Sequence, residues 1–245
     1  MNNLNIEVII TPEEIKDRIL SDKLIVVIDV LRASSTIITA LAKGCRGFIP
    51  IFSPNQAIKE AKQLKLKKED VLLGGERDGE KIEGFHLGNS PREYQKNIIQ
   101  DKIIIFSTTN GVKTFELVKN ADKIIIASFL NLQAVSKYCS SFKKDVLLVC
   151  AGREGKLSLE DTVCTGMLFN SLKSNFSLEN QKKDSNLIAQ LLCDKYRNKL
   201  MEMFNQSQHG RYLKKIGLEA DLEFCAQLNI FNIIPVFKNN LITLE

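Results

Sequence analysis

The chain has 245 residues, of which 44 % are hydrophobic and 26 % are charged, a composition typical of a folded globular protein and not of a disordered one. No apolar run is long enough to cross a bilayer, and the first ten residues lack the features of a signal peptide, so we expect a cytoplasmic protein without membrane contact. The net charge of +5 comes from scattered lysines, which argues against nucleic-acid binding.

Short apolar runs alternate with helical patterns along the whole chain. Strands are predicted at 5–10, 24–28, 48–52, 71–73, 103–106, 123–127 and 146–150, and a closing hairpin at 233–237 and 241–245. Helices are predicted at 11–20, 34–44 and 55–66, from 110 and from 131, and then at 159–173 and 185–204, followed by two shorter ones. Polar residues 174–184 are expected to form an exposed loop. This order predicts an α/β fold, a three-layer α/β/α sandwich with a largely parallel or mixed sheet.

One α/β unit is expected to span residues 1–245. A weak internal similarity relates VVIDVLRASSTIITAL to LLVCAGREGKLSLEDTVCTGML, because both run from a strand through an arginine-bearing loop to a helix. This similarity is compatible with two similar halves, 1–130 and 131–245, and equally with two ordinary strand-loop-helix units. The six cysteines form neither a C-x-x-C pair nor a C-x₅-R phosphatase loop, so we interpret them as buried, reduced side chains.

Four polar or glycine-rich loops follow buried strands, where open α/β sheets bind ligands. They are IDVLRASST, GGERDGEKIEGFHLGNSPREY, STTNGVKTF and CAGREGKLSLEDTVCTG. In the first loop, a serine that merely caps the following helix would explain one hydroxyl but not the added Asp29 and Arg32. In the other three, solvated charges, helix caps and acidic first turns are about as good an explanation as a ligand site.

Arginine is used sparingly in this chain. Only eight of the 34 basic residues are arginine, and three of the eight, Arg32, Arg77 and Arg153, lie near the ends of predicted strands. The planar guanidinium group binds two oxygens of a phosphate, sulfonate or carboxylate, which lysine cannot do in the same way. Histidine is represented only by His86 and His209, without metal-ligand spacing, so a carboxylate site for Mg²⁺ is favoured over a zinc site.

Seven motifs occur in order from about Val27 to Val236: DVLRASST, GGERDG, FHLGNSP, STTNG, CAGREG, EDTVCTG and HGRYLKKIGLEADLEFCAQ. Together they resemble the 2-phosphosulfolactate phosphatase (ComB) family. The resemblance implies a three-layer α/β fold and Mg²⁺-dependent hydrolysis of 2-phosphosulfolactate to 3-sulfolactate and phosphate, a step associated with coenzyme M biosynthesis. It also implies that the partner is a small, anionic, phosphorylated substrate.

Within this hypothesis, Asp29, Glu76 and Asp161 are the expected Mg²⁺ ligands, and Asp29, Arg32 and Arg153 the expected catalytic residues. The expected substrate-binding residues are Arg32, Ser34, Ser35, Thr36, Arg77, Asn89, Ser90, Thr108, Thr109, Asn110, Gly111, Gly152 and Arg153. We favour direct attack by water, because Leu31 stands where a D-x-D phosphoaspartate motif has its second aspartate. His209 could protonate the leaving oxygen, but we favour a surface position for it. Asp221 is expected to be structural unless the C-terminal helices fold over the site.

Two alternatives remain open at this point. One is a phosphatase for another 2-phospho hydroxy acid, and the other is a protein that binds a small anion without turnover. The cluster of acidic residues weighs against the second, since carboxylates beside an anion are unfavourable without a cation. The sequence leaves the oligomeric state undetermined and is compatible with a homo-oligomer.

Overall fold

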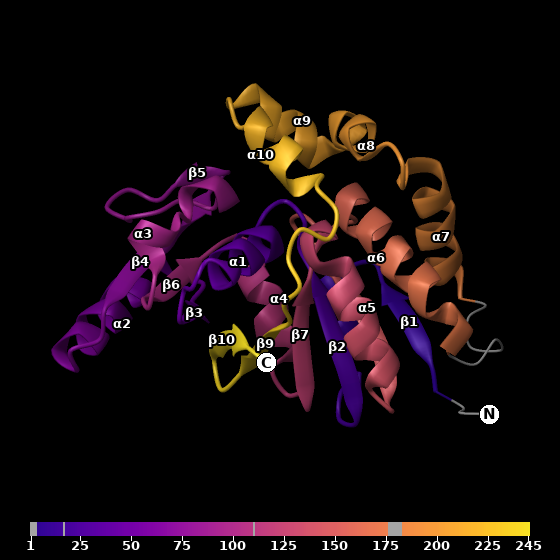
Figure 1. The fold of residues 1–245 in the computed structure, drawn as a ribbon, viewed down its shortest axis with the longest axis horizontal. Coiled ribbons are helices and arrows are strands. Elements are labelled where there is room, and N and C mark those ends of the chain that lie inside the picture. The colour runs from indigo at the N-terminus through magenta and orange to yellow at the C-terminus, as the bar shows by residue number, and fades with distance from the viewer. Residues whose placement is uncertain (1–3, 17, 110, 176–182) are drawn as a thin grey trace.

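The computed structural model describes residues 4–16, 18–109, 111–175 and 183–245. Its centre is a mixed sheet with helices on both faces, which confirms the predicted three-layer α/β/α architecture (Figure 1). The predicted loop at 174–184 lies mostly outside the described residues, as does Asn110. Within the described part of the chain, no helix combines the length and the hydropathy that a membrane crossing requires.

The sheet consists of two parallel blocks joined by an antiparallel hairpin. The first block contains β1 (Ile6–Ile9), β8 (Asp145–Cys150), β2 (Lys23–Ile28) and β7 (Lys123–Ala127), in that spatial order. The second contains β3 (Gly47–Pro50), β6 (Ile103–Ser107) and β4 (Val71–Arg77), with the short β5 (Glu80–Lys81) paired antiparallel to β4. The hairpin of β9 (Pro235–Lys238) and β10 (Leu241–Leu244) separates the blocks. Because β8 lies between β1 and β2, the sheet does not divide at residue 130.

The apolar run of β2 is uninterrupted because both of its faces are buried. Leu24, Val26 and Ile28 pack in the core beneath α5 (Leu132–Ser141) and α6 (Leu159–Leu172). Ile25 and Val27 point to the other face, toward α1 (Ala33–Ala42) and α4 (Gly111–Val118). A third cluster places α2 (Pro54–Leu66) against β4 and β6. All six cysteines are buried and unpaired, as predicted.

The helices differ from prediction at two places. The segment after Thr11 forms only the 3₁₀ turn η1 (Pro12–Ile15). Lys16 leaves the helical conformation, with φ −54° and ψ 135°, and the Glu14 carbonyl accepts a hydrogen bond from Arg18 Nε. The predicted helix 185–204 is two helices, α7 (Asp184–Tyr196) and α8 (Leu200–Gln206). The break lets α7 pack against α6, while α8 turns toward the core through Met203 and Phe204.

Two further helices, α9 (Gln208–Lys215) and α10 (Glu219–Cys225), continue from α8. In Figure 1 the helices α8, α9 and α10 lie above the carboxyl ends of the first parallel block. The remaining short elements are η2 (Pro91–Glu93), α3 (Lys96–Ile99), η3 (Phe129–Asn131) and η4 (Lys173–Asn175). The C-terminal helices therefore cover the carboxyl ends of the first block, where the loops after β2 and β8 begin.

Candidate active site

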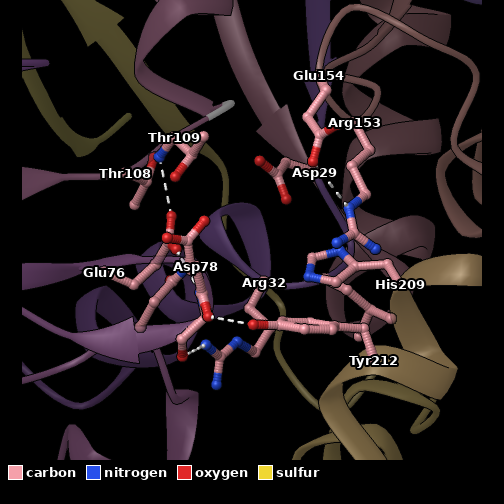
Figure 2. Close-up of a pocket in the computed structure, with 13 residues that line it drawn as sticks. Asp29, Arg32, Glu76, Asp78, Thr108, Thr109, Arg153, Glu154, His209 and Tyr212 are labelled. Atoms are coloured by element: carbon pink, nitrogen blue, oxygen red, sulfur yellow. Dashed lines mark hydrogen bonds and ion pairs between the residues drawn. The ribbon is translucent and has the colours of Figure 1, made fainter. Parts of the chain in front are cut away.

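A polar cavity of about 150 Å³ lies where loops from both parallel blocks meet the C-terminal helices. It is lined by Asp29, Leu31, Arg32, Glu76, Asp78, Gly79, Asn89, Thr108, Thr109, Arg153, Glu154, His209 and Tyr212. Figure 2 shows Glu76, Asp78, Thr108 and Thr109 on one side and Arg153, His209 and Tyr212 on the other, with Asp29 between them. The cavity is small, and it lies where the loops that follow β2 and β8 meet those that follow β4 and β6.

Asp29 is held by the turn between β2 and α1. Its Oδ1 accepts a hydrogen bond from the Ala33 N–H (3.2 Å), and its own N–H donates to Ser34 Oγ (2.9 Å). A Cβ atom on Gly111 would lie 3.0 Å from Asp29 Oδ2, so glycine lets α4 begin close to the carboxylate. Burial, together with the charges of Glu76 and Glu160, raises the pKa of Asp29 to about 7, although the Ala33 hydrogen bond and Arg32 oppose the rise. A carboxylate in this setting favours a nearby cation.

Glu76 comes from the end of β4 and faces the same cavity. Its Oε1 accepts a hydrogen bond from the Thr109 N–H (2.8 Å), and its Oε2 accepts one from the Gly79 N–H (2.9 Å). The preceding Gly75 has a φ of 144°, and a Cβ atom there would lie 2.1 Å from the Ser107 carbonyl oxygen. Only glycine allows β4 to approach β6 this closely, and the approach is what carries Glu76 to the threonine loop.

Four buried polar atoms around the cavity have no hydrogen-bond partner among the described residues. They are Asn89 Oδ1, Thr108 Oγ1, Thr109 Oγ1 and Arg153 Nη1. A buried polar atom left unpaired costs about 1–3 kcal/mol, so a cluster of four is unfavourable unless water or a ligand satisfies them. Three of the four carry donor hydrogens and sit opposite or beside two carboxylates. The cavity is therefore equipped for an anion and a cation together.

His209 and Tyr212 reach the cavity from α9. Burial and the neighbouring guanidinium groups of Arg153 and Arg32 lower the pKa of His209 to about 3, and Glu160 Oε1 lies 3.6 Å from His209 Nδ1. The imidazole is thus neutral near pH 7. Tyr212 donates a hydrogen bond from its hydroxyl to the Asp78 carbonyl oxygen (2.9 Å), which joins α9 to the β4–β5 hairpin across the cavity mouth.

Comparison with known proteins shows the family of this chain. A model of the family described as 2-phosphosulpholactate phosphatase matches residues 9–240. The chain belongs to the 2-phosphosulpholactate phosphatase family. It is 39 % identical over 236 residues to a Clostridium perfringens protein named "Probable 2-phosphosulfolactate phosphatase", covering 96 % of this chain and 94 % of the relative. Proteins with the same name from Caldanaerobacter subterraneus (39 %, 95 % of both chains) and Thermotoga maritima (43 %, 90 % of this chain and 91 % of the relative) are similar to it as well.

Several residues that the sequence predicts to bind substrate form hydrogen bonds within the protein. Ser34 Oγ accepts from the Asp29 N–H, Ser35 donates to the Val30 carbonyl, and Thr36 donates to the Asn89 carbonyl. Arg77 donates to the Glu76 carbonyl (2.6 Å) and to Ser107 Oγ (3.0 Å), and it does not line the cavity. These side chains support the walls of the cavity and do not face a ligand, because their polar groups form hydrogen bonds within the surrounding loops.

Arg32 lines the cavity, but its guanidinium group is largely committed to the protein. It donates from Nη1 to Asp221 Oδ2 and from Nη2 to the Gly79 carbonyl, each at 2.6 Å. Asp221 in turn accepts a hydrogen bond from Ser90 Oγ (2.6 Å), so Ser90 also points away from the cavity. The C-terminal helices do fold over the site, and Asp221 fixes them there. The condition under which a site role was left open for Asp221 is therefore met, yet both of its carboxylate oxygens are occupied, one by Arg32 and the other by Ser90.

Asp161 is not among the residues that line the cavity, although burial and then the nearby charge of Asp29 raise its pKa. Its Oδ1 accepts from the Val30 N–H (2.8 Å) and its Oδ2 from the Gly152 N–H (3.1 Å), so it ties together the loops that follow β2 and β8. Gly152, another residue expected to bind substrate, shapes its loop instead. Its φ is 66°, and a Cβ atom would lie 2.4 Å from the Lys156 carbonyl oxygen.

Replacing Asp161 by asparagine is therefore expected to destabilise the protein without weakening its affinity for Mg²⁺. An amide offers one acceptor oxygen for two backbone N–H groups, so either the Val30 or the Gly152 donor loses its partner, at a cost of about 1–3 kcal/mol. Urea unfolding measures the stability, and calorimetric titration with MgCl₂ measures the affinity. A large loss of Mg²⁺ affinity in a folded variant would show that Asp161 is a metal ligand.

Sequence reasoning gave no site role to Asp78, Glu154 or Tyr212, and it favoured a surface position for His209. The structure places all four around the cavity, with only 17 % of the His209 side chain exposed. A signal for the α9 residues was available: HGRYLKKIGLEADLEFCAQ is one of the seven motifs of the resemblance, and it contains one of only two histidines in the chain. Its side chains could be assigned only once α9 was known to cover the strand ends.

Proposed function

We propose that this chain is a Mg²⁺-dependent phosphatase that hydrolyses 2-phosphosulfolactate to 3-sulfolactate and phosphate, a reaction of the coenzyme M biosynthesis type. The observation that carries the proposal is the group of unpartnered polar atoms of Asn89, Thr108, Thr109 and Arg153 beside the buried carboxylate of Asp29. A phosphorylated anion accompanied by a divalent cation satisfies both sets of groups at once. The names of the relatives support 2-phosphosulfolactate as the phosphorylated hydroxy acid.

The donor set fits Mg²⁺. Asp29 and Glu76 present carboxylate oxygens to the cavity, and hydroxyl and amide oxygens surround them. Among the described residues, no group of three or more His, Cys, Asp or Glu side chains is arranged to hold a metal alone. This agrees with the habit of Mg²⁺, which binds through one or two carboxylates and completes its shell with water and substrate phosphate. When bound, the ion would neutralise charge on the phosphoryl oxygens.

The remaining residues supply binding and orientation. The hydroxyl groups of Thr108 and Thr109 are free to donate to phosphoryl oxygens, and Arg153 donates to an anionic group of the substrate. Asn89 Oδ1 is an acceptor, so it suits the attacking water and not a phosphoryl oxygen. Attack of the water oxygen on phosphorus breaks the bond between phosphorus and the C2 oxygen, and that oxygen leaves with the electron pair and takes up a proton. Positioning and electrostatics carry most of such a reaction.

Phosphate release from 2-phosphosulfolactate tests the proposal. With MgCl₂ the purified chain is expected to release phosphate, EDTA is expected to stop the release, and excess MgCl₂ is expected to restore it. A panel of other 2-phospho hydroxy acids, assayed under the same conditions, ranks the substrates by kcat/KM. Release that EDTA does not affect would contradict the role of Mg²⁺. Absence of release from every compound with Mg²⁺ present would leave the small-anion-binding alternative.

A further inference from the structure

One side of the cavity carries the guanidinium group of Arg153, and its contacts indicate which group of the substrate it binds. We propose that Arg153, held over the ring of Tyr212, binds the sulfonate of the substrate and thereby directs the phosphate toward Asp29 and Glu76. This inference rests on the proposed function, since it assigns the two ends of the substrate to the two sides of the same cavity. It makes Arg153 the residue that determines specificity for a sulfonated substrate.

The first support is the distribution of charge. Arg32 and Arg153 are the two arginines that line the cavity, and Arg32 donates both terminal nitrogens to Asp221 and Gly79. Arg153 Nη1, in contrast, is buried and without a partner among the described residues. Figure 2 shows Arg153 across the cavity from Glu76 and Asp78. A second anionic group, remote from the phosphate, therefore finds its free guanidinium donor only on the Arg153 side.

The second support is that Arg153 is held in place before a ligand arrives. Its N–H donates to the Lys156 carbonyl and the Lys156 N–H donates to the Arg153 carbonyl, both at 2.9 Å, which closes a tight turn. Glu154 and Gly155, at the centre of the turn, have φ values of 53° and 77°. The guanidinium carbon lies 5.1 Å from the centre of the Tyr212 ring, and Arg153 Nε lies 3.8 Å from Glu154 Oε1. A stacked guanidinium group presents its edge, and so its paired donors, in a defined direction.

The third support is the difference between the two acid groups. A phosphate monoester is a dianion that binds Mg²⁺ well, so it can approach the carboxylates of Asp29 and Glu76 together with the ion. A sulfonate is the conjugate base of a strong acid, carries one charge and coordinates Mg²⁺ weakly, so the same carboxylates repel it. A guanidinium group pairs with two sulfonate oxygens without needing a metal. The phosphate therefore belongs on the carboxylate side and the sulfonate on the arginine side.

The experiment compares two substrates that differ only at the sulfonate. They are 2-phosphosulfolactate and 2-phospholactate, in which hydrogen replaces the sulfonate, and their phosphate and carboxylate groups are the same. Arg153→Met is expected to lower kcat/KM for 2-phosphosulfolactate on the order of 100-fold, and for 2-phospholactate less than about threefold, because a lost charge-assisted pair acts on one substrate only. Arg153→Lys is expected to fall between, on the order of 10-fold, since it keeps the charge and loses the fork.

Arg211→Met provides the matched control. Arg211 is an exposed arginine next to Tyr212 on α9 and does not line the cavity. Its removal is therefore expected to change kcat/KM for either substrate by no more than about twofold. Tyr212→Leu removes the ring beneath Arg153 and is expected to lower kcat/KM for 2-phosphosulfolactate by about threefold to tenfold more than for 2-phospholactate. Circular dichroism melting shows that each variant is folded.

The outcomes separate this inference from the proposed function. If Arg153→Met lowers kcat/KM equally for both substrates, the inference is overturned, because Arg153 then acts on the phosphate or the carboxylate. If Arg153→Met lowers kcat/KM for neither substrate, the inference is overturned as well. If the unmodified chain hydrolyses neither compound, the proposed function fails, and calorimetric binding of 3-sulfolactate replaces the kinetics. Weaker binding in Arg153→Met by on the order of 100-fold then supports the sulfonate site, and unchanged binding overturns it.

Discussion

Asp29→Asn is expected to lower kcat/KM for 2-phosphosulfolactate by on the order of 1,000-fold, the largest loss of activity predicted for a single substitution in this chain. Asparagine keeps the shape of the side chain and an acceptor for the Ala33 N–H, but it removes the charge proposed to hold Mg²⁺. Phosphate release measures the loss. Asp22→Asn, which changes an aspartate whose side chain is 86 % exposed, is the control and is expected to retain full activity.

The same substitution has a second, independent readout in stability. The pKa of Asp29 is raised to about 7 in the fold, so between its unfolded value near 3.8 and 7 the native state binds the extra proton. Stability should therefore fall as the pH rises through this window in the presence of EDTA, and Asp29→Asn should flatten that slope. Mg²⁺ at pH 7 should raise the melting temperature of the unmodified chain more than that of the variant. Equal Mg²⁺ stabilisation of both would show that Asp29 is not a ligand.

Asp221→Ala is expected to destabilise the protein by about 3–5 kcal/mol, the largest loss of stability that we predict. Asp221 and Arg32 form an ion pair whose side chains are 1 % and 2 % exposed. Removing the carboxylate leaves the guanidinium group buried without a counter-charge, and it also removes the acceptor of Ser90 Oγ. Urea unfolding, with circular dichroism as the probe, measures the loss in free energy of unfolding.

The double variant Arg32→Met/Asp221→Leu tests the cause. Replacing both charges by apolar groups is expected to recover most of the stability, since the cost arises from one unpaired buried charge. Lys144→Met, which breaks exposed ion pairs with Asp22 and Asp122, is the comparison and should leave the free energy of unfolding nearly unchanged. A loss in Asp221→Ala no larger than that of Lys144→Met would mean that the pair does not hold the C-terminal helices over the site.

The sequence by itself determined the layers of the fold and the loops of the site. The apolar run of β2 has to be buried on both faces, and polar, Gly-rich or hydroxyl-rich loops follow the carboxyl ends of β2, β4, β6 and β8. Asp29, Glu76, Thr108, Thr109 and Arg153 were predicted on this ground, and all five line the cavity. Local pattern finds these residues because each follows the carboxyl end of a buried strand. The two blocks of strands run antiparallel to each other, however, so only the tertiary structure brings the loops after β4 and β6 to those after β2 and β8.

Only the tertiary structure decided which polar groups face the ligand and which hold the walls. Arg32 and Asp221 are 189 positions apart, and Val30 and Asp161 are 131 apart, so no local pattern shows that these side chains satisfy one another. The same holds for His209 and Tyr212, which reach the cavity because α9 packs over strand ends formed much earlier in the chain. A buried charge binds whichever opposite group the fold brings within reach, and that choice depends on long-range packing.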